Sequence, residues 1–245
     1  MRGKIALITG ASSGIGWATA EAFAAEGVQL ILCGRRESRL KALQNLLKVP
    51  SHVLVFDVAD KKAVFDQIHS LPKAFSSIDI LINNAGINIR SSFIDFKEED
   101  WKKIFDINLS GAMIVTQAIL PQMIKKNAGK IINMCSLYSA LGRASVVPYS
   151  VSKGGLKMFT KALCAEIGKY NIQVNGIGPG FIETEMTQSL NKDASFNKWL
   201  STRTPAGRWG NPKDLIGTVV FLASEASNFV NGQILHVDGG ILASV

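Results

Sequence analysis

Three polar side chains in the second half of the chain could together move a proton to or from a small molecule. Tyr149 and Lys153 are four residues apart in a stretch with helical spacing, so their side chains face the same side of a helix. A phenol with its ordinary pKa of about 10 is a poor acid–base group at neutral pH, and a neighbouring ammonium brings it toward the working range. Ser136 follows the predicted strand Gly129–Cys135, where its hydroxyl could bond a carbonyl oxygen. The three residues predict acid–base chemistry on a carbonyl or an alcohol.

Further polar residues are expected at the same edge of the sheet. The segment Asn83–Gly86 directly follows the predicted strand Ile78–Ile82, and the carboxyl ends of parallel strands lie along one edge, where ligands bind. Asn108 falls inside the helix that is predicted after this strand. Asparagine is unfavourable in a helix interior unless its side chain makes a specific hydrogen bond. We therefore expect Asn108 to serve the same site as Ser136.

A glycine-rich turn near the N-terminus could hold phosphate groups. The turn Thr9–Gly16 reads TGASSGIG and lies between the predicted strand Lys4–Thr9 and a helical pattern, Ile15–Ala25. Glycines let the backbone turn sharply and approach a pyrophosphate, and the following helix N-terminus offers free N–H groups and a positive dipole end. The spacing GxxxGxG differs from the commoner GxGxxG, but strand, turn and helix occur in the required order. We expect a dinucleotide to contact these residues of the turn: Gly10, Ser12, Ser13, Gly14, Ile15 and Gly16.

The end of the second predicted strand indicates which dinucleotide is bound. In such folds an acidic residue about 20 residues beyond the glycines binds the ribose 2′-hydroxyl, whereas an arginine suits a 2′-phosphate. Here Gly34 is followed by Arg35 and Arg36, with no acid before Glu37, and arginine can make two charge-assisted bonds to a phosphate. The sequence therefore favours NADP(H) over NAD(H). The alternative is that both arginines only begin a solvated helix, and the turn lacks the extra basic residue that often strengthens the preference.

The order of apolar segments predicts an α/β fold. Short strand-like runs alternate with helical patterns such as Pro148–Ile167, and most runs are apolar at consecutive positions, as in strands that helices cover on both faces. We expect a doubly wound, Rossmann-type parallel sheet of seven strands with helices on both faces. The expected strands are Lys4–Thr9, Val28–Cys33, His52–Phe56, Ile78–Ile82, Gly129–Cys135, Ile172–Ile177 and Gln233–Val237.

A single domain is expected to span residues 1–245, because no repeat, low-complexity tract or linker divides the chain. Dinucleotide binding is expected mainly in residues 1–110, and the catalytic and substrate part in residues 111–245. The least regular region is Gly178–Pro212. A long irregular segment inside a compact domain is usually a lid or binding loop, so we expect residues 182–209 to form a flexible loop that closes over substrate.

Composition argues against several kinds of partner. The net charge is +8, but the basic residues are scattered pairs such as Lys125-Lys126 without a dense run. We therefore expect no nucleic-acid ligand, and we attribute the sign of the charge to an anionic cofactor and an anionic substrate. The longest apolar stretch, Ala112–Ile124, is too short and too polar to span a bilayer, so no membrane contact is expected.

Cysteines and histidines point to a reducing compartment and a metal-free site. The three cysteines include no CxxC motif, which is typical of reduced thiols in a cytosolic protein. The first predicted strand begins almost at once and leaves no room for a signal peptide. The three histidines show no metal-ligand spacing. We expect a cytoplasmic protein with no bound metal.

Taken together, the motifs resemble the short-chain dehydrogenase/reductase family over essentially the whole chain. The resemblance implies an enzyme that transfers a hydride between a nicotinamide dinucleotide and a ketone/secondary-alcohol pair. The features that carry it are TGxxxGIG at Thr9–Gly16, Asp57-Val58, NNAG at Asn83–Gly86, Asn108, Ser136, Tyr149, Lys153, Pro179-Gly180 and Val237–Gly240.

The resemblance also implies a role for each matching residue. Tyr149 gives its proton to the substrate oxygen in reduction and accepts it in oxidation. Lys153 holds the nicotinamide ribose hydroxyls and lowers the pKa of the tyrosine, and Ser136 orients the carbonyl. Asn108 holds a water in a proton relay that reaches Lys153. The remaining cofactor contacts are expected from Asp57 and Val58 at the adenine, Asn84, Ala85 and Gly86 at the adenine ribose, and Pro179, Gly180, Ile182 and Thr184 at the nicotinamide.

Several segments of the C-terminal half resemble gluconate 5-dehydrogenases, a group that reduces 5-keto-gluconate. They are Ile132–Ser136, Leu141–Arg143, Arg203–Gly210 and the run from Phe229 to Gly240. Arg143 follows the catalytic strand and could bind a sugar-acid carboxylate through two hydrogen bonds; Arg90 is a second candidate, and Tyr138 could form a wall of the pocket. The alternative is that both arginines lie on the surface and that Tyr138 only packs against its neighbours without contacting substrate. The expected substrate is a small keto or hydroxy compound with negative charge.

Other substrates and another class of function stay open. The N-terminal half is more similar to NADP-dependent hydroxy-acid (serine-type) dehydrogenases, and deoxygluconate 3-dehydrogenase or 3-oxoacyl-carrier-protein reductase activity would use the same chemistry. A non-catalytic dinucleotide-binding regulator would be expected to lack part of the set Asn108, Ser136, Tyr149 and Lys153, which is complete here. The apolar tail Gly239–Val245 suggests a subunit contact, and the family resemblance implies a homotetramer.

Overall fold

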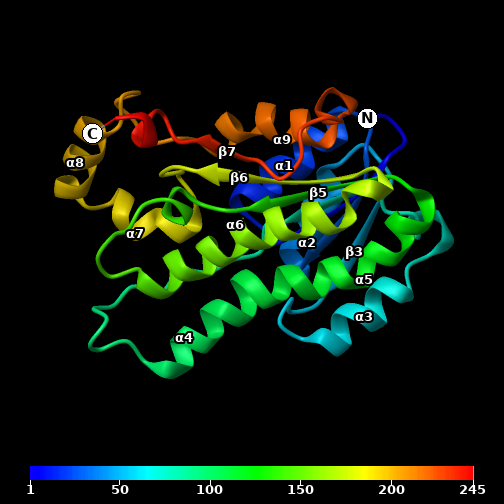
Figure 1. The fold of residues 1–245 in the computed structure, drawn as a ribbon, viewed down its shortest axis with the longest axis horizontal. Helices are drawn as coiled ribbons and strands as arrows, with labels where there is room; N and C mark the ends of the chain where they lie inside the picture. The colour runs from blue at the N-terminus through cyan, green and yellow to red at the C-terminus, as the bar shows by residue number, and fades with distance from the viewer. Residues whose placement is uncertain (245) are drawn as a thin grey trace.

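The computed structural model describes residues 1–244 and contains a parallel sheet of seven strands (Figure 1). The strands lie in the order β3-β2-β1-β4-β5-β6-β7, which confirms the predicted doubly wound sheet. Each strand begins and ends within two residues of its predicted bounds. The bounds are β1 (Ile5–Thr9), β2 (Gln29–Gly34), β3 (Ser51–Val55), β4 (Ile80–Asn83), β5 (Gly129–Met134), β6 (Ile172–Pro179) and β7 (Ile234–Val237).

Helices cover both faces of the sheet. One face carries α1 (Gly14–Ala25), α2 (Glu37–Leu46) and α9 (Ile216–Ala223), and the other carries α3 (Lys61–His69), α5 (Gly111–Lys126) and α6 (Val147–Ile167). Figure 1 shows α5 and α6 on one side of the strands and α1 and α9 on the other. Successive strand residues face opposite layers, so Leu7 packs in one apolar core and Ile8 in the other. This double coverage explains the consecutive apolar residues in the sequence.

The point where the chain reverses its direction of travel lies between β1 and β4. From β1 the chain first builds outward through β2 and β3, and then returns to add β4 on the other side of β1. Such a switch leaves a crevice beyond the carboxyl ends of the two strands, where dinucleotides bind. The glycine-rich turn follows β1 and the NNAG segment follows β4, so the fold brings the two motifs to this crevice.

A long helix crosses one face of the molecule and contains an irregular turn. It begins as α4 (Glu98–Phe105), passes through a π-helical turn at Asp106–Ser110 and continues as α5. Its 29 residues are long and apolar enough to cross a membrane, although half of the apolar window is buried inside the protein. The apolar helix is therefore longer than the stretch Ala112–Ile124 suggested, and its burial is that of a core helix.

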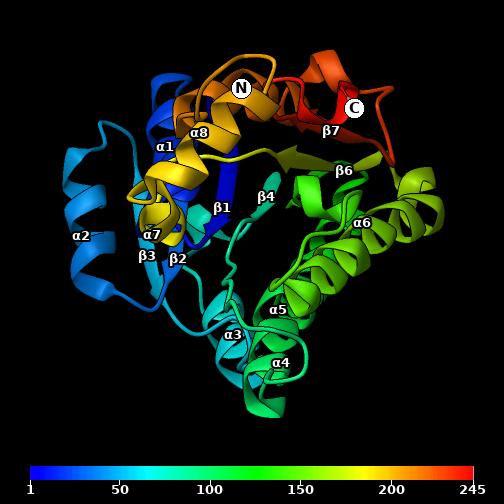
Figure 2. The same ribbon diagram turned by 90° about the vertical axis from the view of Figure 1, so that its left-hand side faces the viewer.

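Residues 182–209 are more regular than expected. The segment contains α7 (Gln188–Asn191) and α8 (Ala194–Arg203), and the Asp193 carboxylate accepts hydrogen bonds from the first N–H groups of α8. Both helices lie beyond the carboxyl ends of the strands (Figures 1 and 2). The segment is a small helical layer above the crevice, since its apolar side chains pack together despite their weak periodicity.

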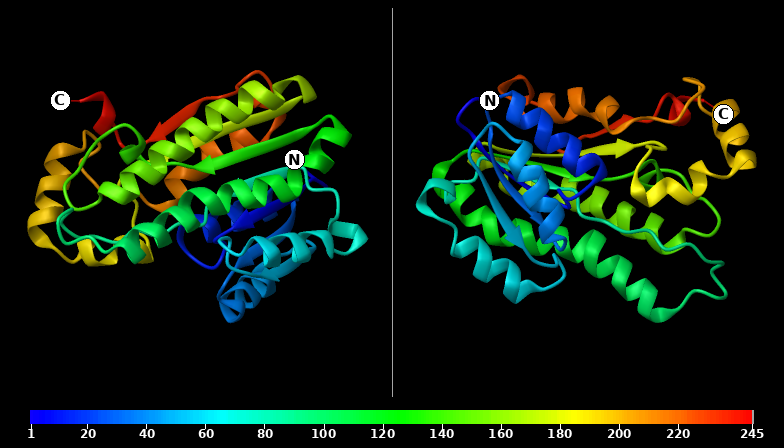
Figure 3. Two further views of the ribbon diagram at one scale, coloured as in Figure 1. Left: turned by 60° about the horizontal axis from the view of Figure 1, so that its bottom comes forward. Right: turned by 180° about the vertical axis from the view of Figure 1, so that it is seen from behind.

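The apolar C-terminal tail packs on its own chain. Ile241 is buried against α8 and its neighbours, and Arg203 of α8 donates hydrogen bonds to Ser244 at 2.7 and 3.0 Å. The last described segment, drawn in red, lies beside α8 in two opposite views (Figure 3, right, and Figure 1). The apolar character of the tail therefore has an explanation within one chain, and Val245 lies outside the described residues.

Candidate active site

A cleft of about 580 Å³ runs along the carboxyl ends of the strands, and it is lined by the turn after β1, the segment after β4 and the loop after β6. This volume suits a cofactor or small-molecule site. Every predicted cofactor residue except Gly16 lines it. Those lining residues are Gly10, Ser12, Ser13, Gly14, Ile15, Arg35, Arg36, Asp57, Val58, Asn84, Ala85, Gly86, Tyr149, Lys153, Pro179, Gly180, Ile182 and Thr184.

Gly16 does not line the cleft, because it faces the interior of the turn. A Cβ at Gly16 would collide with the carbonyl of Gly10, so this glycine permits the close approach of α1 to the turn. Gly10 itself has φ +66°, and a Cβ there would lie 2.9 Å from the Cα of Ala85. The backbone therefore requires glycine at both positions.

Hydrogen bonds from the NNAG segment hold the turn in place. The Asn84 side chain donates to the backbone oxygens of Thr9 and Gly10 at 2.9 and 3.2 Å. The Thr9 hydroxyl accepts the N–H groups of Asn84 and Ala85, both at 3.0 Å. The Asn84 side-chain amide thus holds the backbone of the turn in one conformation, in which it could bind a phosphate.

Ser136, Tyr149 and Lys153 meet in the same cleft, as expected from their spacing. Tyr149 and Lys153 lie on consecutive turns of α6, and Ser136 directly follows β5 and Cys135. The Lys153 ammonium is 5.9 Å from the centre of the Tyr149 ring and donates a 2.6 Å hydrogen bond to the backbone oxygen of Met134. A phenol, a hydroxyl and an ammonium group therefore line the same cleft.

Burial dominates the pKa values of this group. It raises the pKa of Tyr149 to about 12, against the lowering effect of the Ser136 hydroxyl, and it lowers the pKa of Lys153 to about 8. The expected lowering of the tyrosine pKa by Lys153 is not found in this structure, where desolvation of the phenolate is the leading effect and the Ser136 hydroxyl is the group that opposes it. At neutral pH the phenol is protonated, which is the form that can donate a proton.

Asn108 lies in the π-helical turn, fully buried. Its side-chain amide donates to the backbone oxygen of Ile87 at 2.9 Å and to the Ser152 hydroxyl at 3.1 Å. Its side-chain oxygen accepts the N–H of Ile87 at 2.8 Å. The asparagine thus ties the segment after β4 to α6, which accounts for its place in a helix interior. A π turn of this kind often marks a functional site.

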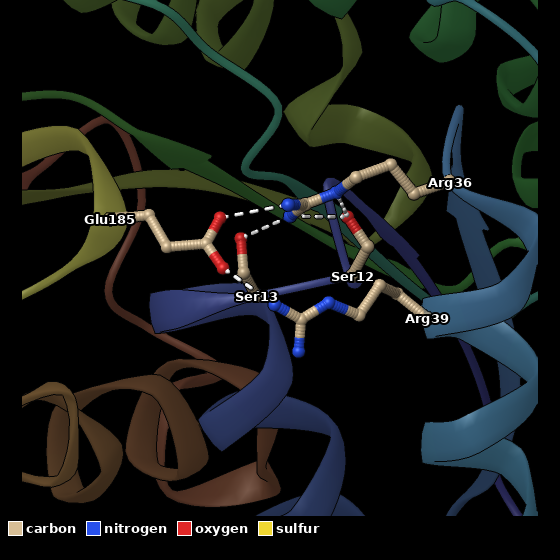
Figure 4. A network of polar contacts seen from close by, with 5 residues as sticks. All are labelled: Ser12, Ser13, Arg36, Arg39 and Glu185. Carbon is tan, nitrogen blue, oxygen red and sulfur yellow. Dashed lines mark hydrogen bonds and ion pairs between the residues drawn. The ribbon is translucent and has the colours of Figure 1, made fainter.

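Arg36, rather than Arg35, lies over the glycine-rich turn (Figure 4). The Arg36 guanidinium donates to the Ser12 hydroxyl at 3.1 and 3.2 Å and to the Ser13 hydroxyl at 2.7 Å. Arg35 instead pairs with Asp57 at 3.3 Å across an exposed surface. The basic group that the turn itself lacks is therefore supplied by Arg36 from the end of β2.

The three predicted substrate residues outside the catalytic set, Tyr138, Arg143 and Arg90, do not line the cleft, but Tyr138 lies beside Tyr149. The ring of Tyr138 is 6.2 Å from that of Tyr149 in an edge-to-face arrangement. Burial raises the pKa of Tyr138, whereas the positive charges of Arg143 and Arg90 lower it. A hydrogen bond of 3.2 Å from Ser91 N–H to the Ser145 carbonyl joins the loops that carry the two arginines.

Arg143 is held by aromatic rings of the helical layer. Its guanidinium carbon lies 4.5 Å from the ring centre of Trp199, 4.9 Å from that of Phe196 and 5.9 Å from that of Phe181. Contacts of this kind are favourable for a cation over an aromatic face. The arginine is therefore neither a loose surface residue nor an occupant of the main cleft.

Several cleft residues were not predicted from the sequence. Glu185, Met186 and Thr187 line the cleft from the loop after β6, and Asn88 lines it from the segment after β4. A signal for Glu185 existed, because it directly follows the predicted nicotinamide contact Thr184. No pattern in the sequence indicated the side that its carboxylate would face.

Comparisons with known proteins agree with this geometry. A family model described as enoyl-(acyl carrier protein) reductase matches residues 10–242. The chain is 42% identical to the 5-keto-D-gluconate 5-reductase of Escherichia coli (strain K12), over 100% of this chain and 98% of that protein.

Two solved structures are also similar. One is a gluconate 5-dehydrogenase from Burkholderia cenocepacia in complex with NADP and tartrate, with TM-score 0.96, 42% identity, and coverage of 100% of this chain and 97% of that one. The other is a short-chain type dehydrogenase/reductase from Mycobacterium marinum, with TM-score 0.93, 31% identity, and coverage of 98% and 96%. The chain belongs to the short-chain dehydrogenase/reductase family of oxidoreductases.

Proposed function

We propose that the protein interconverts a ketone and a secondary alcohol of a sugar acid, such as 5-keto-gluconate and gluconate, with NADP(H) as hydride partner. The observation that carries the proposal is that Ser136, Tyr149 and Lys153 share one cleft with the glycine-rich turn. A proton donor and a dinucleotide site in one cleft suit carbonyl reduction without a metal. The names of the most similar relatives supply the substrate class.

The cleft fits a dinucleotide with a 2′-phosphate. The turn suits a phosphate because positive φ at Gly10 and Gly14 lets its backbone turn sharply, and the N-terminus of α1 follows it. Arg36 supplies a guanidinium beside Ser12 and Ser13, and a solved relative at 42% identity holds NADP. When bound, the nicotinamide ring supplies the hydride. Pro179, Gly180, Ile182 and Thr184 are the residues of this chain that would hold it.

The residues of this chain then handle the proton. The Tyr149 phenol, neutral because burial raises its pKa to about 12, donates its proton to the carbonyl oxygen as negative charge develops there. The Ser136 hydroxyl donates a hydrogen bond to the same oxygen and orients the carbonyl. The Lys153 ammonium stabilises the phenolate that remains, and Asn108 holds the segment Asn84–Gly86 in position through Ile87.

Arg143 and Arg90 suit an anionic substrate. Their charges act on the ring of Tyr138, which lies edge-on to Tyr149, so a carboxylate near them would place the rest of a sugar acid toward the phenol. Burial lowers the pKa of Arg90, and the charge of Arg143 lowers it further. A carboxylate would relieve this repulsion between two cations. Such relief favours an anion over a neutral ketone.

The proposal is tested by activity on matched substrates with both cofactors. Purified protein is assayed with 5-keto-gluconate, gluconate, 2-deoxygluconate, serine and an acetoacetyl thioester, each with NADP(H) and with NAD(H). We expect the highest kcat/KM for the sugar acids with NADP(H). Turnover of the thioester alone would indicate a 3-oxoacyl reductase, and no turnover of either sugar acid with either cofactor would contradict the proposed substrate class.

We further propose a cytoplasmic homotetramer. The apolar tail does not support this, since it packs on its own chain, but the outer face of the helices does. Met113 on α5 and Val151 and Met158 on α6 are exposed, and apolar side chains gathered on a pair of helices suit a subunit contact. Light scattering on a size-exclusion column tests the mass, with about four times that of the 26.4 kDa chain expected.

A further inference from the structure

A carboxylate from the loop after β6 reaches across the cleft to the arginines beside the glycine-rich turn. The Glu185 carboxylate forms ion pairs with the guanidinium groups of Arg36, at 2.8 Å, and Arg39, at 3.2 Å, through a different oxygen in each case. Figure 4 shows the carboxylate facing both guanidinium groups from the opposite side. The hydrogen bond from Arg36 lowers the pKa of Glu185, so the group is an anion at neutral pH.

The position of this anion matters because Arg36 is also the group that meets the turn. Its guanidinium bonds Ser12 and Ser13 with one side and Glu185 with the other. Guanidinium donors that bind a carboxylate are the same donors that would bind a phosphate. A 2′-phosphate that approaches Arg36 therefore meets a negative charge that already uses one of its N–H groups.

We propose that Glu185 competes with the 2′-phosphate of the cofactor for Arg36 and Arg39, and so limits the preference for NADPH over NADH. The inference rests on the proposed NADP(H) function. A phosphate monoester carries a charge of about −1.5 to −2 at pH 7, so its binding must displace or repel the carboxylate. A 2′-hydroxyl is neutral and needs no arginine, and a carboxylate can accept its hydrogen bond. Glu185 therefore disfavours the phosphorylated cofactor specifically.

The competition has a consequence for the loop. Glu185 belongs to the same segment as Thr184 and Met186, which line the cleft. When a phosphate binds Arg36, this segment loses the shorter of its two ion pairs to the region of α2, and when the phosphate also binds Arg39 it loses the second. The presence or absence of a 2′-phosphate therefore changes how firmly the loop after β6 is held over the cleft.

The test compares two ligands that differ only in the 2′-phosphate: adenosine 2′,5′-bisphosphate and adenosine 5′-monophosphate. Calorimetry gives the Kd of each ligand for the full chain and for Glu185→Gln. The quantity compared is the Kd of the monophosphate divided by the Kd of the bisphosphate, which increases as the preference for the 2′-phosphate increases. We expect the variant to bind the bisphosphate about two- to fivefold more tightly, as suits an exposed ion pair, and the monophosphate as before. Glu183→Gln is the matched control, because Glu183 lies two residues away and contacts Asn191. It should leave the ratio unchanged.

The outcomes separate this inference from the proposed function. An unchanged or smaller ratio in Glu185→Gln overturns the competition, even if the unaltered protein prefers the bisphosphate as an NADP(H) enzyme should. If neither protein prefers the bisphosphate, the NADP(H) assignment and the inference both fail. A preference that emerges only in the variant supports the inference.

Hydrogen exchange gives a second readout that affinity does not. Amides of residues 182–191 are expected to exchange faster when the unaltered protein binds the bisphosphate, since this ligand lacks a nicotinamide half to cover them. The monophosphate should not change their exchange. Slower exchange with the bisphosphate would mean that the phosphate tightens the loop, which contradicts the competition.

Discussion

The ammonium of Lys153 lies 2.6 Å from the backbone oxygen of Met134, which ties α6, the helix that also carries Tyr149, to the last residue of β5. The same lysine is only 4% exposed, and burial lowers its pKa to about 8. One hydrogen bond thus fixes the cation of the site in a place where its charge is costly. This balance makes the charge state of the site sensitive to pH above neutrality.

The pH dependence of ketone reduction follows from these two pKa values. Lys153 loses its proton as pH rises through about 8, whereas Tyr149, with a pKa of about 12, keeps its own. Reduction needs both groups protonated, so kcat/KM should be level near neutral pH and fall above about pH 8. Initial rates with saturating NADPH across this range check the expectation. An increase of kcat/KM from about pH 7 to about pH 9 would contradict it.

Removing the phenol of Tyr149 should remove most of the activity. In Tyr149→Phe no group remains to protonate the carbonyl oxygen, and kcat should fall by at least about 10²-fold. NADPH affinity should change little, because the ring is retained. Tyr170→Phe is the matched control, since that phenol lies beside Lys169 and outside the cleft. Near-normal turnover by Tyr149→Phe would falsify the mechanism.

Arg36 should contribute more than Arg35 to NADPH binding. Arg36→Ala removes the guanidinium from Ser12 and Ser13, and loss of charge-assisted bonds to a phosphate should raise the KM for NADPH about tenfold or more. The KM for NADH should change much less. Arg35→Ala serves as the comparison, because Arg35 pairs with Asp57 instead. Equal increases in the KM for NADPH and the KM for NADH in Arg36→Ala would show that the arginine does not bind the 2′-phosphate.

Trp199 should act on substrate binding through Arg143. Trp199→Ala removes the ring 4.5 Å from the guanidinium, so Arg143 becomes free to adopt other rotamers. The KM for a keto acid should rise about two- to thirtyfold, the range of a cation–π contact, while the KM for NADPH stays constant.

Comparing the KM values of charged and uncharged substrates identifies this role. An uncharged ketose should lose no affinity in Trp199→Ala, because it makes no use of the arginine. Trp101→Ala, which removes a ring stacked on Phe105 in α4, is the control for loss of a tryptophan. Equal losses for charged and uncharged substrates would indicate a general disturbance of the helical layer.

The sequence predicted what depends on local pattern. Consecutive apolar residues located most of the strands, because helices cover both faces of the sheet there, and the order of strand, glycines and helix located the turn. The set of Ser136, Tyr149 and Lys153 followed from strand ends and from helix periodicity. These signals are local, and the doubly wound topology brings their carriers together.

The missing features depend on contacts between distant segments. Glu185 and Arg36 are 149 residues apart, and nothing at either position indicates the other. The rings around Arg143 come from the loop after β6 and from α8, whose approach depends on a segment with weak periodicity. The Tyr149 pKa is another case. The spacing predicted that Lys153 would lower this pKa, but it could not predict that burial would raise it to about 12.

The arrangement of β4 also bears on how the chain can be divided. Its neighbours are β1 on one side and β5 on the other, so a fragment ending near residue 110 would keep the glycine-rich turn but leave β4 as an open edge. Open apolar edges pair with other chains, and such a fragment would also lack Glu185 and the nicotinamide contacts. The nucleotide half is therefore not a separable module, and proteolysis between β4 and β5 should yield aggregate rather than a smaller binding protein.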